Sequence, residues 1–198
     1  MECYFDNSAT TVCSDAAAER MQQVLLTDFG NPSSLHGKGM QAENYVKESR
    51  EIIAKTLKCE PKEIIFTSGG SESNNLAIFG SVRANKRVGK HIITTAVEHA
   101  AVYMPFKELE KQGYDVTFLP TDEKGVIRLE DLENALTDDT VLVAMMHVNN
   151  EIGSIMPIAE AGKMIHEKCP NALFFVDAIQ SYGKVPVIPK KMGIDMLS

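Results

Sequence analysis

The sequence of 198 residues contains no tryptophan and only four cysteines. These cysteines show no Cys-x-x-Cys spacing and no nearby histidine pair, so neither a zinc site nor a disulfide scaffold is indicated. We therefore expect no metal site and four reduced thiols, either packed as small apolar groups or exposed: Cys3, Cys13, Cys59 and Cys169.

The sequence also lacks long apolar runs and an excess of basic residues. No stretch approaches the roughly 20 apolar residues of a membrane span, and the start, MECYFDNSATT, lacks the basic and then apolar order of a signal peptide. The formal net charge is -7, with Lys and Arg scattered along the chain, which argues against nucleic acid or an anionic membrane as the main partner. We expect a cytoplasmic protein that binds a small molecule or another protein.

Short apolar runs rich in β-branched and aromatic residues alternate with helical patterns. The runs predict strands at 63–66, 91–95, 115–119, 141–146 and 172–177. Helices are predicted at 15–29, 40–57, 72–86, 100–112, 129–136 and 158–168, the first with Ser14 as its N-cap and one apolar face that carries Ala18, Met21, Val24 and Leu25. Helices of this size connect parallel strands, so we predict an α/β fold whose mostly parallel sheet has helices on both faces.

Polar residues follow four of the five predicted strands. They lie in TSGGSESNN after residue 66, AVEHAAV after residue 95, HVNNEIG after residue 146 and DAIQS from residue 177, whereas the run 115–119 ends in Pro120 and a polar turn. Ligands of open α/β sheets gather at the carboxyl ends of the strands. We therefore expect these four segments to meet at one ligand site.

The segment FTSGGSESNN, residues 66–75, combines glycines and small hydroxyl residues before a predicted helix. Such a loop exposes backbone N–H groups at the positive end of a helix dipole, which suits a phosphate. It has neither the Gly-Lys-Ser/Thr of a Walker loop nor a G-x-G-x-x-G, so a nucleoside triphosphate or NAD is not indicated. The alternative is an ordinary helix start that Ser68 or Ser71 caps.

Asp177 ends an apolar run, and a carboxylate there is costly to bury unless it meets a cation, a metal or a donor. A magnesium ion, a basic side chain or a protonated ring nitrogen could lie opposite it. The alternative is that Asp177 caps a following helix. Gln180 could bind the same ligand or face solvent.

His99 begins a predicted helix directly after a strand, where it could stack on a flat ligand or exchange protons near neutral pH. A packed or capping histidine is the alternative. His147, Asn149 and Asn150 suit a hydrogen-bonding loop or a plain polar turn, and Glu151 is expected to be exposed or paired within that loop.

Six collinear segments of the chain resemble cysteine desulfurases of the NifS/IscS type, which are class V members of the pyridoxal-phosphate (PLP) fold-type-I superfamily. The segments are YFDNSATT, GNPSSLHGKG, EIIFTSGGSESNNLAI, HIITTAVEHAAV, MHVNNEIG and VDAIQSYGKVP. The resemblance covers the chain from end to end. It implies the large domain of that fold, cut short before its C-terminal part.

The resemblance also implies the residues that hold PLP. The turn 69–71 would bind the phosphate through Gly70 and Ser71, where many relatives read Ala-Thr. His99 would stack on the pyridine ring and move protons, and Asp177 would pair with the protonated ring nitrogen. Gln180 and Asn150 would lie at the phenolic oxygen of the ring.

In the family, L-cysteine replaces a lysine in its Schiff base with PLP, and a loop cysteine takes the sulfur as a persulfide and releases alanine. The persulfide passes to an iron–sulfur scaffold or a thiolation protein, and the resemblance implies a homodimer for the full-length form. The lysine belongs to a Ser-x-His-Lys motif that this sequence does not contain. We therefore expect residues 1–198 alone to be inactive, and we assign the persulfide to none of the four cysteines.

The resemblance divides the chain into residues 1–14, a segment that lines the mouth of the active site, and residues 15–198, part of the PLP-binding large domain. Two alternatives to a cysteine desulfurase remain open. One is another class V PLP enzyme, such as a selenocysteine lyase or an aminotransferase. The other is a non-catalytic protein that keeps the fold for binding or assembly. In either case, we expect a half-chain to leave apolar surface uncovered, which favours self-association or partial disorder.

Overall fold

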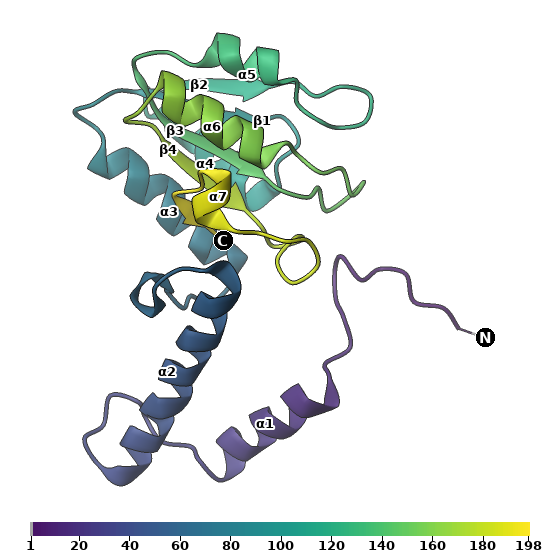
Figure 1. Cartoon of the computed structure of the whole chain (residues 1–198), viewed down its shortest axis with the longest axis vertical. Coiled ribbons are helices and arrows are strands. Elements are labelled where there is room, and N and C mark those ends of the chain that lie inside the picture. The colour runs from purple at the N-terminus through teal and green to yellow at the C-terminus, as the bar shows by residue number, and fades with distance from the viewer. Residues whose placement is uncertain (1) are drawn as a thin grey trace. The chain divides into compact units, whose positions relative to one another are not determined.

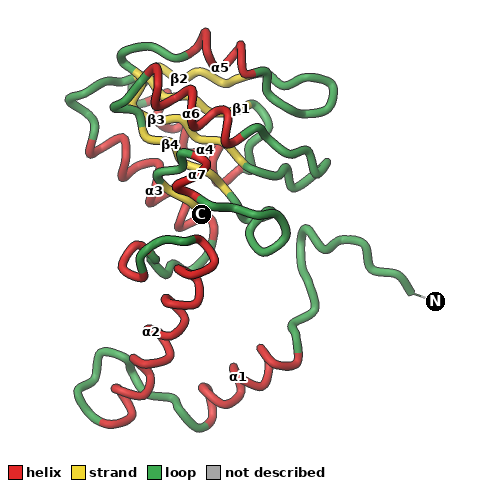
Figure 2. The backbone as a smooth tube through the Cα atoms, viewed as in Figure 1, coloured by secondary structure: helices red, strands yellow, loops and turns green. Residues whose placement is uncertain are grey.

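A computed structural model describes residues 2–198 of the chain. These residues form two compact units, one that ends at Ile65 and one from Phe66 to Ser198. Figures 1 and 2 show the helices and strands of each unit. Each unit is described by itself.

The first unit contains the helices α1 (Asp15–Leu26) and α2 (Gly37–Leu57) and the short 3-10 helix η1 (Pro61–Glu63). The Ser14 side chain accepts a hydrogen bond from the N–H of Ala17 and caps α1, as predicted. The carboxylate of Asp28 is buried and accepts hydrogen bonds from three side chains of α1 and α2: those of Gln23, Gln41 and Tyr45. This buried acid joins the two helices.

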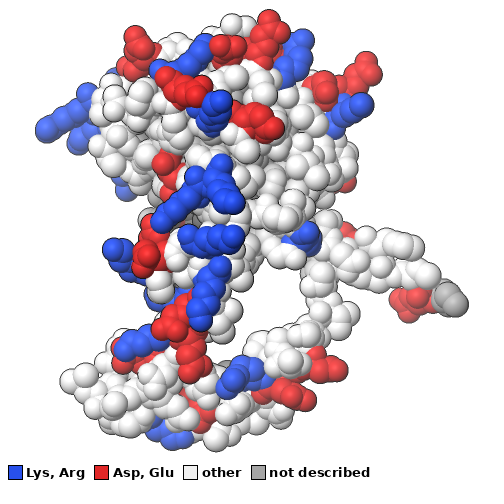
Figure 3. Space-filling view, in the orientation of Figure 1, with Lys and Arg blue, Asp and Glu red and all other residues white. Residues whose placement is uncertain are grey.

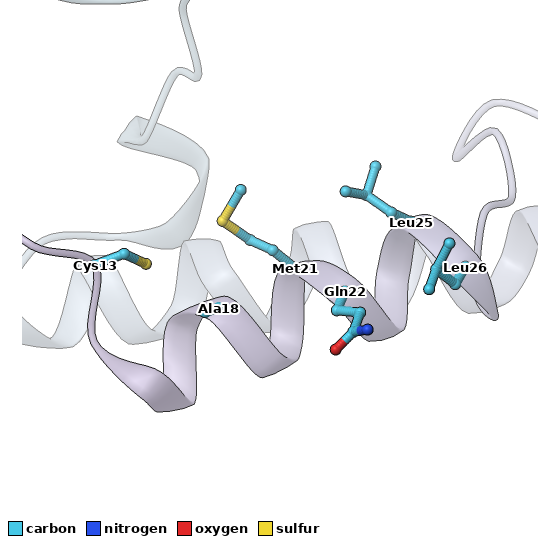
Figure 4. Close-up of a pocket in the computed structure, with 6 residues that line it drawn as sticks. All are labelled: Cys13, Ala18, Met21, Gln22, Leu25 and Leu26. Carbon is cyan, nitrogen blue, oxygen red and sulfur yellow. The ribbon is translucent and has the colours of Figure 1, made fainter.

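The predicted apolar face of α1 is not buried in this structure. The helix ends at Leu26 rather than at residue 29, and none of its residues is buried. Figure 4 shows Met21, Leu25 and Leu26 projecting from the helix, and their exposed fractions are 60%, 69% and 70%. A one-sided apolar pattern predicts a helix, but it does not show which surface the apolar face packs against.

The predicted strand at 63–66 is wrong. Pro61 starts η1, and Glu60 and Glu63 form a capping box around it. Residues 64–66 belong to no strand of the structure, and Ile65 is 70% exposed. A strand forms only where its backbone N–H and C=O groups can bond those of a neighbouring strand. An apolar run in the sequence does not guarantee such a neighbour.

The second unit is built around a five-stranded sheet in which every pair is parallel: β1 (His91–Thr95), β2 (Asp115–Leu119), β3 (Thr140–Met146), β4 (Leu173–Asp177) and β5 (Met196–Leu197). The strand order is β2-β1-β3-β4-β5. The predicted parallel sheet is confirmed, with four of its strands at the predicted places. The two-residue strand β5 and the short helix α7 (Pro189–Met192) were not predicted.

Helices cover both faces of this sheet, as predicted. The helices α3 (Gly70–Ala84) and α4 (Ala100–Lys111) pack on one face, and α5 (Leu129–Ala135) and α6 (Ile158–Lys168) pack on the other (Figure 1). Neighbouring residues of β4 show the alternation, because Phe174 is buried with α6 and Phe175 with α3 and α4. Burial of each such side chain contributes on the order of 2 kcal/mol to the free energy of unfolding.

Polar features of the surface also follow the sequence. Residues 121–127 form the expected turn after Pro120, closed by a bridge between Thr121 and Ile127.

On the face in Figure 3, Lys and Arg alternate with Asp and Glu over the second unit. Among residues 2–198, no helix is both long and apolar enough to cross a membrane.

Candidate functional site

The strand order places the carboxyl ends of β1, β3 and β4 beside one another. The chain leaves β1 for β2 on one side and returns to β3 on the other, which makes the β1–β3 boundary a topological switch point. Open α/β sheets bind ligands outside the strand ends at such a point. The polar segments after β1, β3 and β4 therefore share one edge of the sheet.

Asp177 is the last residue of β4 and is 6% exposed. Its Oδ2 accepts a hydrogen bond from Asn74 Nδ2 of α3 at 2.9 Å, and its Oδ1 accepts one from the N–H of Ile179 at 3.0 Å. Residues 179–184 form turns, so the alternative in which Asp177 caps a helix is not found. Two donors thus fix the plane of the carboxylate and satisfy part of its hydrogen-bonding capacity.

The start of α3 lies directly beside this carboxylate. Asn74 is on the first turns of α3, and a Cβ atom placed on Gly70 would lie 2.6 Å from Cδ1 of Ile179. The loop of residues 69–71 and the segment that begins at Asp177 therefore meet. The convergence that the sequence predicted for these two segments is present.

Within residues 2–198, no side chain caps α3, so the alternative of a serine-capped helix start is wrong. The N-cap is Gly69, and the N–H of Ser68 donates instead to the Glu72 carboxylate at 2.5 Å. That bond lowers the pKa of Glu72. Among the described residues, no acceptor bonds the N–H groups of Gly70, Ser71 or Glu72, which is the usual state of donors at a helix N-terminus that meets solvent or an anion.

His99 is exposed and is the N-cap of α4. Its Nδ1 accepts a hydrogen bond from the N–H of Ala101 at 3.1 Å. His99 therefore caps α4, which is one of the roles that the sequence left open for it. The cap orients the imidazole at the end of β1. A stacking role for the ring stays a prediction.

The residue before His99, Glu98, was not predicted to matter. Its Oε1 accepts hydrogen bonds from Thr95 Oγ1 at 2.6 Å and from the N–H of Met146 at 3.0 Å, whereas its Oε2 is enclosed without a partner among the described residues. Burial, and secondarily the charge of Asp177, raises the pKa of Glu98 to about 8.

The loop after β3 is organised by Asn149, which is buried. Its Oδ1 accepts from the N–H groups of Glu151 and Ile152, and its Nδ2 donates to the carbonyl of Val97. Asn150 donates to the exposed Glu151 at 2.7 Å, so Glu151 is both exposed and paired within the loop. A direct role for Asn150 toward a ligand stays a prediction.

His147 is 4% exposed, and its Nδ1 is enclosed without a partner among residues 2–198. Burial lowers the pKa of His147, so the ring is neutral at pH 7. Gln180 lies in the turns after β4, where its Oε1 accepts from Lys184 Nζ at 3.1 Å. Both residues occupy the predicted edge of the sheet.

Sequence reasoning missed Asn74 and Glu98. Asn74 forms its bond with a residue 103 positions away, so no local pattern identifies it. Glu98 carried a signal that could have been used, because an acid three residues past the end of a buried strand is expensive to enclose unless it is neutral or hydrogen-bonded.

The fold and this edge define an α/β protein with a candidate ligand site at the carboxyl ends of parallel strands. The family model for class V aminotransferases matches residues 3–198, and the chain belongs to that family. Curated relatives include the "Cysteine desulfurase IscS" of Clostridium botulinum strain Hall, which is 47% identical over the whole chain, and that of Dictyoglomus turgidum, which is 46% identical. The chain spans about half the length of these relatives, namely their N-terminal half.

Solved structures agree with this assignment. A "NIFS-LIKE PROTEIN" superposes on the whole chain with a TM-score of 0.96 at 38% identity, and the chain covers 55% of it. A structure titled "SspA in complex with cysteine" superposes on 98% of the chain with a TM-score of 0.93 at 40% identity, and the chain covers 56% of it. The resemblance to the NifS/IscS type is therefore confirmed.

Proposed function

We propose that this chain is the cofactor-binding N-terminal half of a PLP-dependent cysteine desulfurase. One observation carries the proposal. The buried carboxylate of Asp177 is fixed by Asn74 beside a helix start whose first N–H groups have no acceptor among the described residues. An acid next to an anion-binding helix end suits a ligand that carries both a cationic ring and a phosphate.

The start of α3 fits the phosphate of PLP. The N–H groups of Gly70, Ser71 and Glu72 would donate to it, assisted by the positive end of the dipole of a 15-residue helix. The Ser71 hydroxyl would add a further donor. The Glu72 carboxylate, which would repel a phosphate, is bonded to the N–H of Ser68.

The carboxyl ends of the strands fit the ring. Asp177 accepts two hydrogen bonds and keeps lone pairs for a protonated pyridine nitrogen, whose charge it would hold in place. His99 would stack on the ring and move protons, and Gln180 and Asn150 would bond its phenolic oxygen, as in the family. When bound, PLP withdraws electrons from the bonds at the α-carbon of an amino acid.

The names of the relatives make L-cysteine the proposed substrate, and one solved neighbour is titled as a complex with cysteine. In the full-length enzyme, the sulfur of L-cysteine would pass to an enzyme thiol, leaving a persulfide and releasing L-alanine. An iron–sulfur scaffold or a thiolation protein would accept the persulfide sulfur. We place this homodimeric enzyme in the cytoplasm, and we assign its PLP-binding lysine to the half that this sequence does not contain.

The proposal is tested by titrating the 198-residue chain with pyridoxine 5′-phosphate, which has the ring and phosphate of PLP but no aldehyde to react with surface lysines. We expect weak, saturable binding that Asp177→Asn lowers at least tenfold, because a charge-assisted hydrogen bond contributes on the order of 2 kcal/mol. Pyridoxine without the phosphate should bind more weakly still.

Asp195→Asn is the matched control. Its carboxylate also supports the sheet, through the N–H of Phe174 at 2.7 Å, but near the amino end of β4. The Asp195→Asn variant should therefore bind pyridoxine 5′-phosphate with the same affinity as the unchanged chain. Equal affinities for the unchanged chain and for Asp177→Asn would contradict the proposed site.

A further inference from the structure

Glu98 lies where β1 and β3 separate. The two strands pair from His91 to Ile93, and their pairing ends before the last residues of either strand. Beyond this point, the N–H of Met146 donates to Glu98 Oε1, and the hydroxyl of Thr95 donates to the same oxygen. The Glu98 side chain thus accepts the hydrogen bond of a β3 N–H group at the point where β1 no longer provides a backbone carbonyl.

The second oxygen of Glu98 indicates its protonation state. Oε2 is enclosed, and no donor among the described residues reaches it. An ionised carboxylate in this position would leave charge on an oxygen without a partner, which costs more free energy than the unpaired O–H of a neutral acid. The direction of the pKa agrees, because burial raises the pKa of Glu98 to about 8.

We propose that Glu98 is a positioning residue, a neutral carboxylic acid that bridges the diverging ends of β1 and β3 and thereby fixes the loops that carry His99 and Asn150. A second bond joins the same loops, from Asn149 Nδ2 to the carbonyl of Val97 at 3.1 Å. The bridge itself is independent of any ligand, and its role in the site rests on the proposed function.

One charged group acts on Glu98 from a neighbouring element, namely Asp177 at the end of β4. Its negative charge favours the protonated form of Glu98. The two hydrogen bonds to Oε1 act in the opposite direction. Removal of the Asp177 charge should therefore lower the pKa of Glu98, which couples the bridge to the acid of the site.

The first experiment measures thermal unfolding of the chain and of Glu98→Gln from pH 5 to pH 9. Because the folded state holds the Glu98 proton more tightly than the unfolded state, its contribution to stability is full below about pH 4.5 and is lost as the pH rises through 8. Relative to Glu98→Gln, the unchanged chain should lose roughly 5 °C or more of its melting temperature between pH 6 and pH 9.

Glu123→Gln is the control, since Glu123 is an exposed acid in the turn after β2. Its melting temperature should follow that of the unchanged chain at every pH. A difference between the chain and Glu98→Gln that stays constant from pH 6 to pH 9 would overturn the proposal.

Infrared spectroscopy gives a reading that needs no stable variant. The unchanged chain should show the carbonyl band of a protonated carboxylic acid at pH 7, which disappears with a midpoint near pH 8 and at a lower pH in Asp177→Asn. Absence of this band at pH 6 would also overturn the proposal.

The role in the site is tested with pyridoxine 5′-phosphate at pH 7. Glu98→Ala should weaken binding about tenfold or more, and Glu98→Gln, which keeps the acceptor, should restore it. Equal binding by all three forms would refute the positioning role while leaving the proposed function intact. If no form binds the analogue, the proposed function and the site role fail together, and the pH profile still decides whether Glu98 is a neutral bridge.

Discussion

Replacing Gly70 with alanine should reveal the contact between the start of α3 and the segment after Asp177. A Cβ atom at this position would lie 2.6 Å from Cδ1 and 3.3 Å from Cγ1 of Ile179, closer than carbon atoms normally approach. Ile179 is 51% exposed, so its side chain can move aside. The substitution therefore has two opposing effects: alanine stabilises the helix more than glycine does, and its Cβ clashes with Ile179.

The two effects are similar in size. Alanine in place of glycine in a helix stabilises it by about 0.5–1 kcal/mol. Overpacking against a rigid core costs about 1–3 kcal/mol, and displacement of the end of an exposed side chain should cost close to the lower limit, about 1 kcal/mol. We expect Gly70→Ala to change the free energy of unfolding of the chain by less than about 0.5 kcal/mol. In the Ile179→Ala background the same change should stabilise by about 0.5–1 kcal/mol.

The assay is urea unfolding followed by far-UV circular dichroism, because the chain has no tryptophan to report by fluorescence. The four proteins of the double-mutant cycle give the coupling between positions 70 and 179 directly. Gly80→Ala is the control, since Gly80 lies in the same helix and a Cβ there meets no atom within 4 Å. It should stabilise equally in both backgrounds. If Gly70→Ala also stabilises the chain equally in both backgrounds, position 70 and Ile179 are not in contact. The start of α3 and the segment after Asp177 would then not form one site.

Two further predictions concern acid stability and activity. Burial lowers the pKa of His91, against the opposing charges of Asp115 and Asp139, so the folded state holds this ring neutral and stability should fall as the pH drops below about 6.5. His91→Gln should flatten that loss in a pH series of urea unfolding, and an identical acid limb in both proteins would contradict the assignment. The 198-residue chain supplied with PLP and L-cysteine should release no sulfide in a colorimetric assay, and sustained turnover would show that a lysine of this half can bind the cofactor productively.

Much of the second unit could be predicted because its strands are apolar runs with β-branched and aromatic residues, separated by helices of crossover length. The run EIIF has the same composition and is not a strand, since Pro61 and the Glu60–Glu63 capping box start a 3-10 helix that takes up its first residue, Glu63. The two residues of β5 are too few to leave a periodic pattern. Their place depends on β4, which they join through Phe175 and Val176.

The edge of the sheet that carries the site was predictable from strand order, whereas its internal contacts were not. Asp177 stood out because an acid ends an apolar run. Asn74 did not, because an amide near a helix start has many ordinary uses, and only the fold brings it to the carboxylate 103 residues away. Glu98 was overlooked beside His99 because the sequence does not show that Met146 presents its N–H at that point.

The strand order also bears on how the chain folds during synthesis. After β1 forms, β2 adds to one side of it and β3 to the other, and β4 and β5 then extend the growing sheet outward from β3. No strand has to be inserted between two that are already joined. The second unit can therefore assemble in the order in which the ribosome releases it, by successive addition at an open edge, although each parallel pairing must wait for its crossover helix.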